Sequence, residues 1–342
     1  MPYTREVWTL ASRVKGELTE EHFKIKEEEM RDLCKGEIVC RALYISVDPI
    51  TRLHIAYSEP GQPILGRQIA RVVESKNPDY PKGKLLIGSM GWSSYSTVDP
   101  TLTQVLGGHE VPLVETLPRQ LENASMPKSA ALGLLGVPGL TAYIGLTEVC
   151  KARPGETIVI SSAAGQMGHL VGQIAKEIGL RVIGYTGSSE KASWIKTELG
   201  FDWAFNYKTQ DVAQTLKIAA PEGVDIFWDA VGGSLSTNII NNMAIFGRII
   251  LVGNLASYGN LTSPSKLSML DLAITLKEIS ITGVNVYRYY HLWDSARQAL
   301  LQLFKEEKIK GYEHVVEGFE ALPSSFIDQL DGVSQGKVIV RV

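Results

Sequence analysis

The residues best suited to bind a charged cofactor lie in the stretch 161–179, SSAAGQMGHLVGQIAKEIG. Gly165 and Gly168 sit between an apolar run that predicts a strand and an apolar period that predicts a helix. Gly165 would let the backbone approach a pyrophosphate, and Gly168 would let the helix pack closely on the strand, with free N–H groups at the helix start facing the phosphates. Ala163 stands where a dinucleotide fingerprint usually has its first glycine. The alternative is a turn whose glycines serve packing only.

The segment after the next predicted strand indicates which dinucleotide would bind. An NAD site usually has an acidic residue about 20 positions beyond the glycines, where it bonds the ribose hydroxyls. Here YTGSSEK offers small hydroxyl residues, including Ser188, and then Lys191, while the first acid, Glu190, is already in a predicted helix. Small donors and a cation suit an adenosine 2′-phosphate, so the sequence predicts NADP(H). The alternative is that Lys191 is an ordinary solvated helix lysine.

A third motif, GGHE at 107–110, raises the question of a zinc site. This motif resembles the Gly-His-Glu of zinc alcohol dehydrogenases, but a catalytic zinc would also need cysteine or further histidine ligands. Cys34 and Cys40 lack the flanking residues of such a ligand, and no cluster of four cysteines exists for a structural zinc. We therefore expect His109 to be a loop histidine and predict no metal site.

Alternating strand and helix patterns from Gly155 onward supply the elements that would position these residues. The predicted strands occupy 156–164, 181–186, 203–206, 224–230, 247–253 and 278–287. The predicted helices occupy 170–178, 188–199, 209–220, 234–244 and 294–306. This alternation predicts an α/β fold, a Rossmann doubly wound parallel sheet with helices on both faces. Residues 1 to about 125 are β-rich instead, and the tail 336–342 predicts a strand that returns to that first domain.

Composition excludes several classes of protein. A chain of 342 residues is too long for one comfortable core, and 44% hydrophobic with 21% charged residues is typical of a globular protein. A net charge of −3 gives no bulk attraction to nucleic acid, and no apolar run approaches the length of a membrane span. The first residues do not form a secretion signal, and three widely spaced cysteines predict a reducing, cytoplasmic setting.

Specific blocks of sequence run along the whole chain and carry a family resemblance. They are LYISVDP (43–49), GRQIARVVES (66–75), GVPGLTAYIGLTEVC (136–150), AAGQMGHLVGQIAK (163–176), GSSEK (187–191), LGFDWAFNYKT (199–209), DAVGG (229–233) and FGRIILVG (246–253). In these blocks the sequence resembles the zinc-free branch of the medium-chain dehydrogenases/reductases. Within that branch it is similar to the leukotriene 12-hydroxydehydrogenase / prostaglandin reductase group, which is related to plant alkenal double-bond reductases.

The resemblance implies a fold and an activity. A GroES-like β-rich domain would comprise 1–125 and 311–342, a Rossmann NADPH-binding domain would comprise 126–310, and the active site would lie in the cleft. NADPH would reduce the carbon–carbon double bond of an enone or enal, such as a 15-oxoprostaglandin or an alkenal, by hydride transfer to the β-carbon. A cytoplasmic homodimer is expected. Two alternatives stay open, an NADPH quinone reductase and a non-catalytic NADPH-binding protein.

The resemblance also assigns residues to the cofactor. They are Gly165, Gln166, Met167, Gly168, Ser188, Lys191, Tyr207, Gly253, Asn254, Tyr258, Val284, Asn285 and Ser334. Because charge would develop on the substrate carbonyl oxygen only in the transition state, a hydrogen-bond donor aimed at that oxygen would lower the barrier most. Tyr258 is the first candidate for this donor, and Tyr57, in a predicted loop at 53–60, is the second. The alternative for Tyr258 is packing against the cofactor without a chemical role.

Three departures from the family pattern bear on the substrate and the cofactor. Ala230 replaces an Asn in the DNVGG block, and Ser334 aligns with an Asn near the C-terminal Gly-Lys. Both changes would remove hydrogen-bond partners of the cofactor or leave them to water. Ile50 and Thr51 replace Tyr-Met after VDP, which would alter the wall of the substrate pocket and leaves the physiological substrate open.

Overall fold

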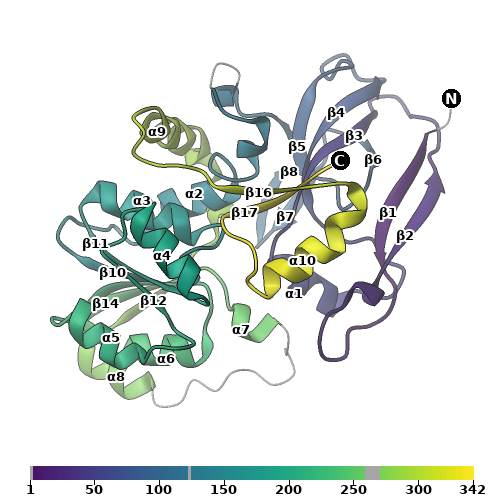
Figure 1. Ribbon diagram of the computed structural model, residues 1–342. Coiled ribbons are helices and arrows are strands. Elements are labelled where there is room, and N and C mark those ends of the chain that lie inside the picture. Colours follow the sequence, from purple (N-terminus) through teal and green to yellow (C-terminus); the bar gives the residue numbers. More distant parts are fainter. Residues whose placement is uncertain (1–2, 122–124, 259–269) are drawn as a thin grey trace. The chain divides into compact units, whose positions relative to one another are not determined.

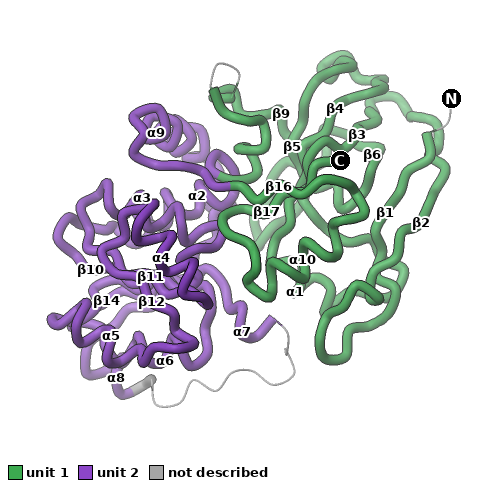
Figure 2. Tube along the Cα trace, viewed as in Figure 1, with its two compact units in different colours: residues 1–133, 313–342 green, residues 134–312 purple. Residues whose placement is uncertain are grey.

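The computed structural model describes residues 3–121, 125–258 and 270–342. The chain divides into two units, and Figure 2 shows each in its own colour. Unit 1 comprises residues 1–133 and 313–342, and unit 2 comprises residues 134–312. Unit 2 carries the alternating strand and helix pattern and most of the predicted cofactor residues.

Within the described part of unit 2, six parallel strands form one sheet. In spatial order they are β12 (Trp203–Asn206), β11 (Arg181–Thr186), β10 (Thr157–Ile160), β13 (Val224–Asp229), β14 (Met243–Leu251) and β15 (Ser280–Gly283). The chain starts at β10, runs outward through β11 and β12, and then returns to β13 on the other side of β10. The predicted Rossmann doubly wound sheet is therefore confirmed, with the reversal of strand order between β10 and β13.

Helices cover both faces of this sheet, as Figure 1 shows. One layer contains α2 (Val137–Ile144), α3 (Gly168–Ile178), α4 (Ser189–Thr197) and α9 (Trp293–Lys305). The other layer contains α5 (Val212–Ala219), α6 (Gly233–Asn241) and α8 (Leu270–Lys277). Because both faces are covered, the central strands are apolar without alternation. Ile158, Val159 and Ile160 of β10 are all fully buried.

Local capping explains where several of these helices begin and end. The Ser188 hydroxyl accepts a hydrogen bond from the backbone N–H of Lys191, so Ser188 is the N-cap of α4. Asp211 caps α5 in the same way. Gly179 ends α3 in a left-handed conformation with φ of 94°, which glycine adopts without a steric cost.

Several predicted boundaries in unit 2 are wrong. The strand predicted over 156–164 ends at Ile160, where the glycine turn begins. The strand predicted over 278–287 is limited to Ser280–Gly283, because Asn285 caps a 3₁₀ helix over Val286–Leu292. The helix predicted over 234–244 ends at Asn241. Strand β14 begins at Met243, which pairs with Val224 of β13, so pairing in the sheet overrides the helical pattern there.

Unit 1 is built on a seven-stranded sheet. Its strands are β16 (Glu313–Glu317), β17 (Lys337–Arg341), β3 (Ile38–Ser46), β4 (Arg67–Ser75), β5 (Leu85–Ser89) and β9 (Val114–Thr116) in that order, with β6 (Tyr95–Val98) paired to β3. Two further strand pairs are β1 (Thr4–Leu10) with β2 (Phe23–Glu29) and β7 (Thr103–Leu106) with β8 (His109–Pro112). Strand β17 lies antiparallel to β3, so the predicted return of the C-terminal tail is confirmed.

Unit 1 also contains helices that the sequence patterns missed. Residues 53–60 were expected to be a loop, but α1 (Ile50–Tyr57) includes Tyr57 as its last residue. Thr51 and Ile55, four residues apart, are 2% and 3% exposed, and Ile55 packs in the same core as α10 (Leu322–Leu330). The buried face of this short helix depends on residues far along the chain, so no local period indicated it.

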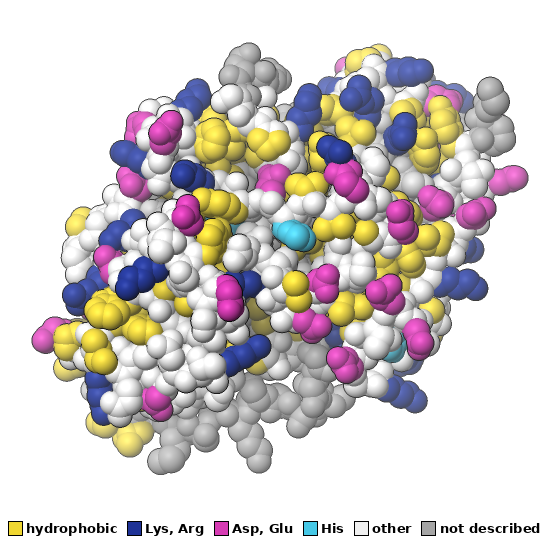
Figure 3. All heavy atoms as spheres, viewed as in Figure 1, with side chains coloured by type: hydrophobic (Ala, Val, Ile, Leu, Met, Phe, Trp, Pro, Cys, Tyr) yellow, Lys and Arg dark blue, Asp and Glu magenta, His cyan; other side chains and the backbone are white. Residues whose placement is uncertain are grey.

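The surface carries charges of both signs. In the view of Figure 3, Lys and Arg side chains are interspersed with Asp and Glu over both units. Within the described ranges, no helix is both long enough and apolar enough to cross a membrane.

Candidate functional site

The predicted cofactor residues of unit 2 come together at one edge of its sheet. All six strands are parallel, so the segments that follow them emerge at the same edge. These segments are 161–167 after β10, 187–188 after β11, 207–208 after β12, 230–232 after β13, 252–254 after β14 and 284–285 after β15. The strand order reverses at β10 and β13, which is where open α/β sheets bind ligands.

The glycine turn after β10 has no room for side chains at its two glycines. A Cβ on Gly168 would lie 2.3 Å from the carbonyl oxygen of Ser162, and one on Gly165 would lie 2.8 Å from the Ser162 hydroxyl. Gly168 therefore allows α3 to begin directly against the turn. The positive φ of 51° falls on Ser162, and Ala163 has an ordinary backbone conformation, as its side chain requires.

The start of α3 presents backbone amides that have no partner. Among the described residues, the N–H groups of Gln166, Met167 and Gly168 have no hydrogen-bond acceptor. The side-chain oxygen of Gln166 is also buried without a donor. Helix α3 is 11 residues long, so its positive end adds to the field of these amides. This arrangement fits the pyrophosphate of a dinucleotide.

The side chains of Lys208 and Tyr207 lie beside Gly187 at the end of β11, and the charge of Lys208 also acts on Lys191. A Cβ on Gly187 would lie 3.6 Å from Lys208 Nζ and 3.7 Å from the Tyr207 hydroxyl. Burial lowers the pKa of Lys191, and the positive charge of Lys208 lowers it further. Like charges held together in this way are suited to a dianion such as the 2′-phosphate of NADP(H).

Lys208 is a residue that the sequence interpretation missed. It follows Tyr207 directly, but only the pairing of β12 beside β11 brings it next to the Lys191 segment. Its backbone N–H donates to the side-chain oxygen of Asn206 at 3.0 Å, which shapes the turn out of β12. The position of Lys208 next to the Lys191 segment therefore follows from the order of strands in the sheet and not from the spacing of residues in the sequence.

Asp229 organises the turn after β13 and was also missed. Its side chain is 3% exposed and accepts hydrogen bonds from the backbone N–H groups of Val231 and Gly232, each at 3.0 Å. The Ser161 hydroxyl donates to the same carboxylate at 3.0 Å and accepts from the N–H of Ala230 at 2.9 Å. These bonds join the carboxyl ends of β10 and β13, the two strands at the reversal.

Backbone bonds hold the 253–258 loop beside that turn. The N–H of Leu255 donates to the Ala230 carbonyl at 3.1 Å, and the loop then forms α7 (Leu255–Tyr258). The hydroxyl of Tyr258, which is half-buried, lies 3.4 Å from where a Cβ on Gly253 would sit. The Tyr258 side chain therefore brings its hydroxyl back to Gly253. Asn254 of the same loop is exposed.

The remaining predicted residues of this edge follow β15. The N–H of Val284 donates to the Leu251 carbonyl at 2.9 Å, which holds the segment beside the end of β14. The side chain of Asn285 accepts a hydrogen bond from the N–H of Tyr287 at 3.2 Å. Asn285 thus has a local capping partner.

Tyr57 and Ser334 belong to unit 1. Tyr57 is 77% exposed at the end of α1, and Ser334 lies between α10 and β17. His109 was expected in a loop but begins strand β8, where it pairs with Leu106. Among the described residues, no group of three or more His, Cys, Asp and Glu side chains could hold a metal ion.

His169, on the first turn of α3, is a further residue that the sequence patterns did not indicate. It is 1% exposed, and burial lowers its pKa to about 4. Its Nδ1 lies 2.8 Å from the carbonyl oxygen of Gly165, inside the glycine turn.

The buried histidine predicts a loss of stability in mild acid. His169 is neutral in the folded state, whereas in the unfolded state its pKa returns to the ordinary value for histidine. Between the two pKa values the unfolded chain therefore binds more protons than the folded chain. The free energy of unfolding should therefore fall by roughly 3 kcal/mol between pH 6.5 and pH 4. Urea unfolding across this range should show a steeper decline for the wild type than for His169→Asn. Equal slopes would contradict this prediction.

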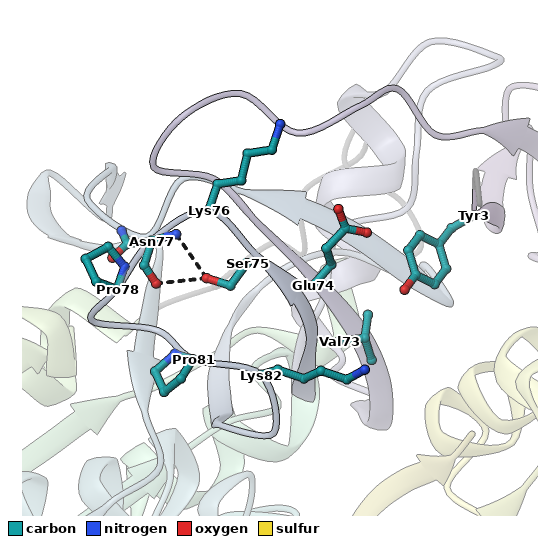
Figure 4. A pocket seen from close by; sticks show the side chains of 9 residues that line it. All are labelled: Tyr3, Val73, Glu74, Ser75, Lys76, Asn77, Pro78, Pro81 and Lys82. Atoms are coloured by element: carbon teal, nitrogen blue, oxygen red, sulfur yellow. Dashed lines mark hydrogen bonds between the residues drawn. The ribbon is translucent and has the colours of Figure 1, made fainter.

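Figure 4 shows a pocket in unit 1 whose lining residues are distant in sequence from the predicted cofactor residues. It has a volume of about 560 Å³, and its lining comes from Tyr3, the end of β4 and the turn that follows. The Ser75 hydroxyl donates to the Asn77 carbonyl at 2.8 Å and accepts from the Asn77 N–H at 3.0 Å. These polar groups stabilise the turn itself, and none of the lining residues was predicted to bind the cofactor.

Two family models match the chain. Residues 6–106 match the N-terminal domain of oxidoreductase, and residues 167–306 match a model described as zinc-binding dehydrogenase. The first matched range lies in the β-rich unit 1, and the second lies in unit 2, which contains the Rossmann sheet.

Full-length relatives are similar over nearly the whole chain. Prostaglandin reductase 1 of Bos taurus is 42% identical over 98% of this chain and 98% of its own length. The NADP(+)-dependent 2-alkenal reductase of Nicotiana tabacum is 37% identical over 90% of this chain and 88% of its own. The crystal structure of CurA from Vibrio vulnificus in complex with NADPH superposes with a TM-score of 0.87 at 30% identity, covering 98% of this chain and 99% of that one.

Proposed function

Because the chain belongs to the medium-chain dehydrogenase/reductase family, in the group of the prostaglandin and alkenal reductases, we propose that it reduces the carbon–carbon double bond of α,β-unsaturated ketones and aldehydes with NADPH. The observation that carries the NADPH part of this proposal is that Lys191 and Lys208 interact at the same edge of the sheet as the start of α3, where three backbone amides have no acceptor among the described residues. One end of this edge suits a 2′-phosphate, and the other suits a pyrophosphate.

Each part of the cofactor then has residues to hold it. Gln166, Met167 and Gly168 would bind the pyrophosphate through backbone N–H groups, and Gly165 would leave space for it. Ser188, Lys191, Tyr207 and Lys208 would bind the adenosine phosphate. The nicotinamide end would meet Gly253, Asn254, Tyr258, Val284 and Asn285 of unit 2. Ser334 of unit 1 remains a cofactor residue that only the family resemblance assigns. Ala230 offers no polar side chain, so it could contribute only backbone groups.

The protein's own chemical contribution is an oriented hydrogen-bond donor. When bound, the cofactor supplies a hydride to the β-carbon. Negative charge then gathers on the substrate carbonyl oxygen, where a fixed donor stabilises the transition state more than the ground state. We assign this donor to the hydroxyl of Tyr258, which lies close to Gly253, and keep exposed Tyr57 as the second candidate. The α-carbon can take its proton from water.

The activity is tested with the simplest substrate pair. The purified protein should oxidise NADPH in the presence of 3-nonen-2-one and should not do so with 2-nonanone, which lacks the double bond. With NADPH deuterated at the transferred position, the product should carry deuterium at the β-carbon. A quinone is run beside the enone. Faster turnover of the quinone, or no turnover of the enone, would contradict the proposal.

We also propose that the protein is a homodimer that pairs through β15. This strand is the edge of the sheet, and all four of its residues are exposed. Apolar side chains are exposed on it and on the neighbouring strand, with Ile281 at 47% and Phe246 at 67%. An open edge with apolar side chains favours pairing with a second copy.

Light scattering during gel filtration should give twice the monomer mass for the wild type. Ile281→Lys places a charge on the proposed interface and should give the monomer mass. Val315→Lys serves as the control, because it introduces the same charge at an exposed apolar position of β16 in unit 1. A monomeric wild type, or an unchanged mass for Ile281→Lys, would argue against pairing through β15.

A cytoplasmic setting and a zinc-free site complete the proposal. Cys34, Cys40 and Cys150 are all free thiols, and burial raises the pKa of Cys40 to about 12 and of Cys150 to about 11. Unpaired cysteines of this kind suit a reducing compartment. Metal analysis of the purified protein should find less than one zinc per ten chains, and cell fractionation should recover the protein with cytoplasmic markers.

A further inference from the structure

His169 has partners on both ring nitrogens, and they fix its chemical form. Nδ1 lies 2.8 Å from the carbonyl oxygen of Gly165, and Nε2 lies 3.3 Å from the backbone nitrogen of Tyr312. A carbonyl can only accept a hydrogen bond, and a backbone N–H can only donate one. The imidazole must therefore be neutral, with its proton on Nδ1 and its lone pair on Nε2.

The segment 310–312 is anchored firmly enough to set this orientation. Gln173, one turn further along α3 and 4% exposed, donates to the Lys310 carbonyl at 3.0 Å and accepts from the Lys310 N–H at 2.8 Å. The Tyr312 ring packs edge-on against His169 and against Trp194 of α4, with centroid distances of 6.1 and 5.0 Å. The imidazole is thus held from behind by a bonded and packed stretch of backbone within unit 2.

The hydrogen bond to Gly165 also decides where the next amide points. In a trans peptide the carbonyl and the following N–H point in opposite directions. The Gly165 carbonyl is directed toward His169, whose own backbone N–H also lies within reach, at a donor–acceptor distance of 3.3 Å. The N–H of Gln166 must therefore point away from the imidazole, and it has no acceptor among the described residues.

Glycine makes this restraint necessary. A residue without a Cβ allows its peptide unit to rotate at little cost, so the Gly165–Gln166 peptide would otherwise sample several orientations. We propose that His169 is a positioning residue for cofactor binding, whose Nδ1–H holds the Gly165–Gln166 peptide so that the Gln166 amide faces the pyrophosphate. The inference rests on the proposed function, since it assumes that the turn binds NADPH.

The first test compares two substitutions in a binding assay. His169→Leu removes the donor, and losing one directed hydrogen bond should raise the Kd for NADPH about tenfold. His169→Asn places an amide donor near the former Nδ1 and should recover most of the affinity. His314→Asn, at an exposed position in β16, is the control and should bind like the wild type. Titrations use protein fluorescence at a temperature where every variant is folded, so turnover is not needed.

The second test uses the wild-type protein and so does not depend on a variant folding. Nitrogen-15 NMR of the histidine rings should show one neutral imidazole with its proton on Nδ1, with and without NADPH. A proton on Nε2, a Leu variant within twofold of the wild type, or an Asn variant no better than Leu would overturn the role of His169. Failure of the wild type to bind NADPH at all would instead overturn the proposed function.

Discussion

Replacing Lys191 and Lys208 together should abolish the preference for NADPH over NADH. Each lysine is expected to form a charge-assisted hydrogen bond with the 2′-phosphate, and losing one such bond weakens binding about 10- to 100-fold. Lys191→Ala and Lys208→Ala should each raise the Kd for NADPH by that factor, and the double variant by roughly 1,000-fold. The Kd for NADH should change less than threefold, because NADH lacks the phosphate that these residues would bind.

The repulsion between Lys191 and Lys208 should also affect the thermal stability of the protein without NADPH, which an isolated solvated lysine would not do. The charge of Lys208 lowers the pKa of Lys191, so the pair repels in the absence of a ligand. Lys208→Ala should therefore leave the thermal stability of the free protein unchanged or raise it, while it weakens NADPH binding. Lys217→Ala, at an exposed position on α5, is the control for general loss of charge. A twofold or smaller change in the NADPH Kd of Lys191→Ala would contradict the assignment.

Tyr258→Phe should lower kcat for an enone by about 100- to 1,000-fold, the usual effect of removing one donor from a developing oxyanion. The substitution keeps the aromatic ring and removes only the hydroxyl, so the Kd for NADPH should rise only a few-fold. A loss in kcat with little loss in binding is the signature of an interaction made in the transition state. The measurement is steady-state kinetics with 3-nonen-2-one, together with NADPH titration of each variant.

Two further tyrosine variants show whether a loss of kcat is specific to Tyr258. Tyr80→Phe, whose ring lies under Lys84 in unit 1, controls for loss of a tyrosine hydroxyl elsewhere and should keep full activity. Tyr57→Phe tests the second candidate. A large loss of kcat for Tyr57→Phe with full turnover for Tyr258→Phe would transfer the donor role to Tyr57.

Much of unit 2 could be predicted from its sequence because its signals are local. The apolar periods give strands and helices in alternation, and parallel strands joined by helices form a doubly wound sheet by the handedness of the crossover. Gly165 and Gly168 were recognised from their place between a strand and a helix. Each of these features depends on residues within one turn or one strand of its neighbours.

The residues that were missed act through contacts distant in sequence. Lys208 lies beside Gly187 only because β12 pairs beside β11, and Asp229 joins β10 to β13 through Ser161. The tautomer of His169 depends on Tyr312, far along the chain, whose backbone N–H donates to Nε2. The sequence by itself determined the alternating elements and the glycine turn, because propensity, capping and steric limits are local properties of the chain. Tertiary structure alone decided which side chains surround that turn, because strand order and the burial of polar groups arise only when distant segments pack together.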